Sequence, residues 1–273
     1  MKQIIGHLNQ STTIGLSGGL LLILVMILIA PEHIGAFFNI PGLIVVLGGT
    51  VAATLVSRPI KEVVPVLRKI PLLMKDYAPD AHTEIKQLLN FAEYYRRGGI
   101  RQAEQLIEKI NHPILVAGMR HIVDGGPRNG LIKMIRYRVQ NQRQRGEAEV
   151  QILRTMAVFA PAFGMLGTLF GLIHMLYGLG SSGIAEIGTA MGFAMITTLY
   201  GIVAANLFLK PLAMKLERRH QQEIAINHML CEGLLMVQER SHPSLIMDSL
   251  ESFGVSSHDL YTGGRTSSLA SAA

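Results

Sequence analysis

Four long runs of this chain contain no Asp, Glu, Lys or Arg, and they constrain its fold more than any other feature. They cover residues 8–31, 34–57, 155–185 and 187–209. Each is longer than the roughly 20 apolar residues that a helix needs to cross the hydrocarbon core of a bilayer. Charged residues make up 16% of the chain, against about 25% in a typical soluble domain. The sequence therefore predicts an all-α polytopic membrane protein with four transmembrane helices, which excludes a secreted or cytosolic enzyme.

Positive charge is concentrated between the second and third runs. Residues 58–154 hold 18 of the 25 Lys and Arg residues, whereas the short connectors 31–34 and 178–188 hold none. Because positively charged segments stay on the cytoplasmic side of a membrane, we expect the long insert and both termini to be cytoplasmic. The net charge of +6 then reflects topology and attraction to anionic membrane lipids, and nucleic-acid binding is not expected.

The runs and the turn-forming residues between them divide the chain into six parts. Apolar residues recur at helical spacing from Ile85 and the pattern breaks at Gly98-Gly99, which predicts a helical insert. Helical spacing returns between Ile226 and Val237, which predicts a C-terminal amphipathic helix. The predicted parts are a cytoplasmic N-terminus (1–11), transmembrane helices one and two (12–57), a cytoplasmic domain (58–154), transmembrane helices three and four (155–212), a cytoplasmic amphipathic helix (213–254) and a disordered tail (255–273).

Motifs for catalysis or metal binding are missing from the sequence. There is no GxSxG, Walker, HExxH or CxxC motif, and Cys231 is the only cysteine. The histidines are scattered, so no metal site and no cofactor are expected. The sequence therefore does not predict an enzyme.

Small and hydroxylated residues follow one face of each of the last two runs. In the third run, one face carries Pro161, Gly164, Thr168, Gly171 and Met175, and in the fourth a comparable face carries Ala190, Ala194, Thr197, Thr198, Gly201 and Ala205. Such faces allow helix backbones to approach closely in lipid. They could also line a narrow polar track for an ion. The spacing of these residues favours helix packing, and it does not exclude a polar track for an ion.

An ionisable group inside the membrane usually marks an ion pathway, and His174 is the only such group in the four runs. If this chain conducts ions, the titrating carboxylate must therefore come from another chain.

Several segments carry a resemblance to a known family. Residues 160–172 (APAFGMLGTLFGL) and 195–201 (MITTLYG) resemble the third- and fourth-span motifs of the flagellar stator A subunits, the MotA/PomA family. Residues 40–50 (IPGLIVVLGGT) resemble that family's second span, and residues 96–99 (RRGG) its cytoplasmic turn. The resemblance extends from residue 12 to about residue 250.

The resemblance implies a homopentamer in the bacterial inner membrane around B subunits, each with one span, an intramembrane Asp and a peptidoglycan-binding domain. Inward flow of Na⁺ or H⁺ would turn the pentamer against the rotor switch protein FliG. Carried over by position, Thr168, Thr197 and Thr198 would line the ion path. Pro161 and Pro211 would be conformational prolines, and Arg96, Arg97 and Glu104 would face the rotor.

The ion and the function class stay open at this point. The threonines are typical of sodium-type members, whereas Asn39 stands where those members often carry Asp near the outer mouth. Sodium is therefore only slightly favoured over the proton. The alternatives to a stator are a proton-driven energiser of the cell envelope, of the ExbB/TolQ type, and a membrane scaffold that conducts no ion.

Overall fold

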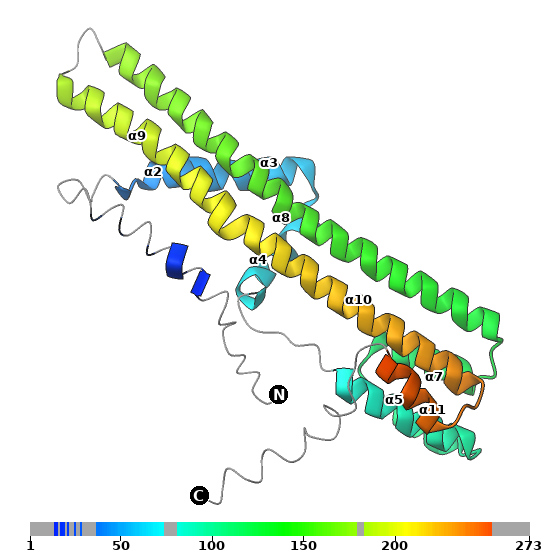
Figure 1. The fold of residues 1–273 in the computed structure, drawn as a ribbon. Helices are drawn as coiled ribbons and strands as arrows, with labels where there is room; N and C mark the ends of the chain where they lie inside the picture. The colour runs from blue at the N-terminus through cyan, green and yellow to red at the C-terminus, as the bar shows by residue number, and fades with distance from the viewer. Residues whose placement is uncertain are drawn as a thin grey trace, which may run out of the picture. The chain divides into compact units, whose positions relative to one another are not determined.

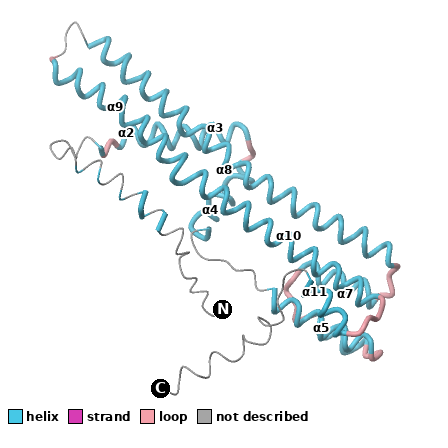
Figure 2. Tube along the Cα trace, in the orientation of Figure 1, coloured by secondary structure: helices cyan, strands magenta, loops and turns pink. Residues whose placement is uncertain are grey.

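A computed structural model describes residues 37–73, 81–178 and 183–252, together with separate residues between 14 and 28. All regular structure in these residues is helical, and they contain no strand (Figure 2). The predicted all-α class is confirmed. Most of the first charge-free run, the whole predicted N-terminus (1–11) and the tail predicted to be disordered lie outside the described residues.

Three helical stretches of the described chain are long and apolar enough to cross a membrane: Ile40–Ser57, Arg128–Gly178 and Glu186–Gln238. They contain most of the second and third charge-free runs and all of the fourth. The count of four spans and the position of the insert stay predictions. The chain divides into two compact units, with Met1–Tyr77 and Arg145–Arg219 in the first and Ala78–Gln144 and His220–Ala273 in the second.

The first unit contains the apolar helices. Its second run forms α2 (Ile40–Leu43), a π-helical segment η2 (Ile44–Gly48) and α3 (Gly49–Ser57), and is followed by α4 (Ile60–Leu73). Asn39 caps the beginning of α2, because its side-chain oxygen accepts a hydrogen bond from the Gly42 N–H. α3 is followed by Arg58, whose backbone is extended because Pro59 comes next.

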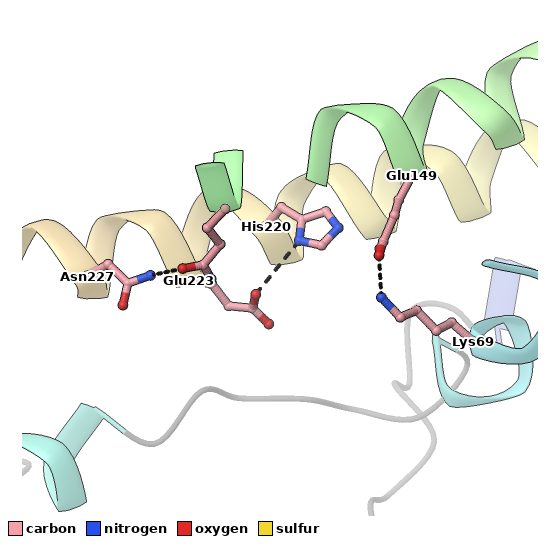
Figure 3. A network of polar contacts seen from close by, with 6 residues as sticks. Lys69, Glu149, His220, Glu223 and Asn227 are labelled. Carbon is pink, nitrogen blue, oxygen red and sulfur yellow. Dashed lines mark hydrogen bonds and ion pairs between the residues drawn. The ribbon is translucent and has the colours of Figure 1, made fainter. Parts of the chain in front are cut away.

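The third and fourth runs form the end of α8 (Arg128–Gly178), then α9 (Ile184–Val203) and a second π-helical segment, η3 (Ala204–Leu209). α10 (Lys210–Gln238) follows η3 directly. α4 packs on α8 through a buried cluster that includes Val66, Leu153 and Ala160. At the edge of this cluster, Lys69 on α4 pairs with Glu149 on α8 at 2.5 Å (Figure 3).

The second unit is a bundle of α5 (Ala81–Arg96), α6 (Ile100–Ile107), α7 (Pro113–Val123), α11 (Pro243–Ser252) and the parts of α8 and α10 that belong to it. Most of the apolar residues at helical spacing in α5 and α10 lie in its core, whereas Leu89 and Ile226 are only partly buried against it. Ile85 and Leu88 of α5, and Leu230 and Leu234 of α10, are fully buried in one cluster. The predicted helix break at Gly98-Gly99 separates α5 from α6.

Burial shifts the pKa values of two side chains of the second unit. Desolvation lowers the pKa of His112, with a smaller opposing contribution from the Glu84 carboxylate. Burial raises the pKa of the Cys231 thiol to about 12, and Glu232 adds to the shift. Because only the thiolate is a good nucleophile, Cys231 is chemically inert at neutral pH.

Candidate functional site

α8 and α9 pack directly against each other through small residues (Figure 1). A Cβ atom built on Gly164 would lie 2.9 Å from the Thr197 carbonyl oxygen, and one on Gly171 2.8 Å from the Ala190 carbonyl oxygen. A Cβ atom built on Gly201 would lie 2.6 Å from the Ala160 carbonyl oxygen. These atoms belong to backbone, so the interface has no room for larger side chains. The packing interpretation of the two small-residue faces accounts for all three glycines.

The line of closest packing on α8 is slightly rotated from the predicted face. Its most buried members are Ala160, Gly164, Gly167 and Gly171. Pro161, Thr168 and Met175 are partly exposed and lie at its edge. Sequence spacing alone could not distinguish these two faces, because neighbouring residues on a helix differ by only about 100°.

The three candidate threonines occupy different environments. Thr197 is fully buried and lies against Gly167 of α8 and Gly42 of α2. Its hydroxyl donates to the Ala194 carbonyl oxygen at 2.9 Å. The Thr198 hydroxyl makes a long hydrogen bond of 3.5 Å across the interface to the Gly164 carbonyl oxygen.

Thr168 is nearer to the surface of the first unit. Its hydroxyl donates to the Met165 carbonyl oxygen of its own helix at 2.6 Å, and none of the described contacts joins it to the other two threonines. All three hydroxyl protons are therefore used by backbone carbonyls, a common arrangement for Thr in apolar helices. Each oxygen keeps lone pairs that a cation could use.

The two candidate prolines lie at different kinds of position. Pro161 is inside α8, and its Cα atom would be 3.1 Å from a Cβ on Gly201. Pro211 is the second residue of α10, immediately after η3. Proline has no N–H to donate. The turn before Pro211 is wide, since the Lys210 N–H donates to the Ala205 carbonyl oxygen, five residues earlier.

The Tyr200 side chain, in the fourth run, forms hydrogen bonds with the backbone at the beginning of the second run. The Asn39 N–H donates to the Tyr200 hydroxyl oxygen at 2.9 Å, and that hydroxyl donates to the Phe37 carbonyl oxygen at 2.5 Å. Asn39 therefore has a structural role as a cap and as a partner of Tyr200, in addition to any role near an ion entrance. Sequence reasoning missed Tyr200; the available signal was a phenol in an otherwise apolar run.

Replacing Tyr200 with Phe should destabilise the protein by about 1–3 kcal/mol, because two partly buried backbone groups lose their partner. We expect a lower thermal unfolding midpoint for the detergent-solubilised protein. Tyr177→Phe is the matched control, since Tyr177 on α8 is 84% exposed. Equal midpoints for the two variants would contradict this role of Tyr200.

The charged residues predicted to face a rotor lie around the turn between α5 and α6. Arg96 ends α5, and Arg96, Arg97 and Glu104 are all exposed. Arg97 pairs with Glu93 at 2.6 Å, with side chains 70% and 48% exposed. Such an exposed pair contributes only about 0–1 kcal/mol, so Arg97 can exchange Glu93 for another partner at little cost.

The described apolar helices offer no buried carboxylate. Within 37–57, 155–178 and 183–209 the only acidic residue is Glu186, which is exposed in the first turn of α9. His174 is also exposed. No group of three His, Cys, Asp or Glu side chains in the described residues could hold a metal ion.

The chain is similar both to a protein-family model and to individual proteins. Residues 106–229 match the family model described as the MotA/TolQ/ExbB proton channel family. The chain is 32% identical to motility protein A of Borreliella burgdorferi, over 90% of this chain and 94% of the relative. It is 26% identical to chemotaxis protein PomA of Vibrio alginolyticus, over 90% and 95% of the two chains.

Two solved structures share the fold. A C. jejuni MotAB structure matches with a TM-score of 0.79 at 20% identity, covering 90% of this chain and 95% of that chain. The flagellar MotAB stator complex from Bacillus subtilis matches with a TM-score of 0.77 at 26% identity, covering 89% and 94%.

Proposed function

Because the chain belongs to the motility protein A group of the MotA/TolQ/ExbB proton channel family, we propose that it is the ion-conducting stator subunit of a bacterial flagellar motor. In this role it couples inward cation flow to torque on the rotor. It is a membrane protein and not an enzyme. Its relatives include motility protein A chains and PomA, and its structural neighbours are MotAB stator complexes.

The observation that carries this proposal is the absence of a buried carboxylate from the described apolar parts of α8 and α9, residues 155–178 and 183–203, where Glu186 is the only acid and is exposed. The hydroxyl groups of the three candidate threonines are bonded to backbone carbonyls, and these ranges have no buried carboxylate that could exchange a cation. An ion pathway through a membrane usually contains such a group. We therefore infer that a partner chain supplies the carboxylate. The resemblance to stator A subunits implies that this partner is a single-span B subunit with an intramembrane Asp and a peptidoglycan-binding domain, and the similarity to a MotAB stator complex supports it.

We also propose how the chain assembles and how it is oriented in the membrane. The chain would form a pentamer around the B subunits in the bacterial inner membrane, with both termini in the cytoplasm. The distribution of Lys and Arg along the sequence supports this orientation. Arg96, Arg97 and Glu104 would contact the rotor switch protein FliG, and anionic lipids would surround the basic cytoplasmic side.

The transported ion is proposed to be sodium in preference to the proton. Na⁺ needs several hard oxygen ligands at once, and Thr168, Thr197 and Thr198 keep hydroxyl lone pairs near the α8–α9 interface. The long bond of Thr198 is the easiest to redirect towards a cation. Pro161 and Pro211 would permit the helices to change shape as the ion passes.

The experiment is complementation of a bacterium that lacks all stator genes. We expect swimming when this chain is expressed together with its B subunit and none when it is expressed alone. A second arm replaces sodium with potassium at constant pH and membrane potential, and we expect swimming to fall. Full swimming without sodium would reject only the sodium assignment. An assembled pair that never restores swimming would reject the stator function.

A further inference from the structure

Three helices of the second unit end in the same way. Each ends with a pair of backbone hydrogen bonds that reach back over the last turn, the arrangement of a Schellman motif. The pairs are Gly99 N–H to Tyr94 O with Gly98 N–H to Tyr95 O, Gly126 N–H to His121 O with Gly125 N–H to Ile122 O, and Ser241 N–H to Met236 O with Arg240 N–H to Val237 O.

The residue at the left-handed position differs in the third case. α5 and α7 use glycine there, with φ of 79° at Gly98 and 70° at Gly125. α10 uses Arg240, with φ of 58°, and it is the only residue other than glycine with positive φ in the described part of the chain. A Cβ atom makes this conformation unfavourable, whereas glycine adopts it freely. Since the backbone favours glycine, the reason for an arginine must lie in its side chain.

The Arg240 side chain is held against the end of α5. Its guanidinium carbon lies 5.5 Å from the centroid of the Tyr95 ring, within the range of a cation–π contact. Tyr95 in turn stacks on Phe91, with ring centroids 6.0 Å apart and ring planes 7° apart. Phe91 is fully buried in the core. Arg240 is therefore an exposed cation on an aromatic support that is fixed in the core.

The two residues before Arg240 fix the end of α10 to the turn between α7 and α8. The Gln238 side chain donates to the Gly126 carbonyl oxygen at 2.8 Å, and Glu239 pairs with Arg128 at 2.8 Å. The nearest carboxylate in sequence is thus engaged by another arginine. None of the described ion pairs includes Arg240, so its charge is available to a partner.

We propose that Arg240 is a rotor-contact residue, which together with Arg96 and Arg97 binds an acidic segment of the rotor switch protein. Tyr95 immediately precedes Arg96 and Arg97, so its contact with Arg240 brings all three cations to the end of α5. Glu93 offsets only one of them. This inference rests on the proposed stator function and extends its rotor-facing surface from the α5–α6 turn to the end of α10.

A purely structural role makes a different prediction. An exposed cation–π contact is weak, and glycine would remove the unfavourable backbone conformation at the same position. Arg240→Gly therefore separates the two roles, because it removes the charge without straining the fold. Arg240→Lys keeps the charge, and Arg240→Glu reverses it. Arg138→Glu, at an exposed position on α8, is the control for an equal change in net charge.

Each variant is tested in the full chain with its B subunit. The measurements are the thermal unfolding midpoint of the purified complex, the number of stator units at each motor, and the stall torque of single motors. We expect Arg240→Gly to keep or raise the midpoint and to weaken recruitment about two- to fivefold, the size of one exposed ion pair. Arg240→Glu should weaken recruitment further, whereas Arg240→Lys and Arg138→Glu should resemble the wild type.

Two results would overturn the proposal. A lower unfolding midpoint for Arg240→Gly, with torque falling in parallel, would show that Arg240 stabilises the fold and does not contact the rotor. Normal recruitment and torque for Arg240→Glu would show that no partner meets this charge. Failure of the stator function itself is distinguishable, because the wild-type complex would then also give no torque.

Discussion

Reconstituted alone in lipid vesicles, this chain should pass no measurable Na⁺ or H⁺ current. Within the described apolar ranges 37–57, 155–178 and 183–209 the only carboxylate is that of Glu186, exposed at the beginning of α9. The buried Thr197 hydroxyl cannot replace a carboxylate, because it neither carries charge nor titrates near neutral pH. Moving an ion through the bilayer without such a group is strongly unfavourable.

The measurement is cation flux under an imposed membrane potential, with the chain alone and with its B subunit. We expect flux only from the complex, and flux should be lost when the B subunit's intramembrane Asp is replaced by Asn. This Asp→Asn complex is the control for correct assembly, since it retains both chains. Potential-driven flux through the isolated chain would show that the pathway lies within it and would refute the shared-site mechanism.

Replacing Gly201 with Val should prevent α8 and α9 from packing and should lower the amount of folded protein in the membrane. The first added carbon atom would lie 2.6 Å from the Ala160 carbonyl oxygen and 3.1 Å from the Pro161 Cα atom. Backbone atoms of a helix cannot move aside as a flexible side chain can. Overpacking typically costs about 1–3 kcal/mol and sometimes more, and the upper end is expected here.

Gly192→Val is the matched control for Gly201→Val. Gly192 is also on α9, but a Cβ atom built on it would meet nothing within 4 Å apart from its chain neighbours and the backbone of its own helix. Both variants replace glycine with a β-branched residue in the same helix, so their propensity effects cancel to within about 1 kcal/mol. The thermal unfolding midpoint of the solubilised chain and the yield of membrane-inserted protein should fall only for Gly201→Val. A similar loss for both would mean that helix propensity, and not close packing, explains the effect.

The features that the sequence determined by itself are those set by local composition. The charge-free runs predicted the apolar helices, because a bilayer requires long uninterrupted apolar segments. The Gly98-Gly99 break was readable, because glycine readily adopts the left-handed conformation at a helix end. The burial of Ile85 and Val237 followed from helical spacing. The missing carboxylate, which points to a partner chain, needed only the order of residues.

Tertiary structure alone decided which groups meet. The Tyr200 hydroxyl bonds to Phe37 and Asn39 in a distant part of the chain, and no local pattern encodes that pairing. Helical spacing placed Thr168 on the small-residue face of α8, whereas packing put Gly167 at its centre and left Thr168 at the edge. The contact of Arg240 with Tyr95 likewise depends on how α10 ends beside α5. Periodicity tells which face of a helix is apolar, but the neighbour that covers this face is fixed only when distant segments pack together.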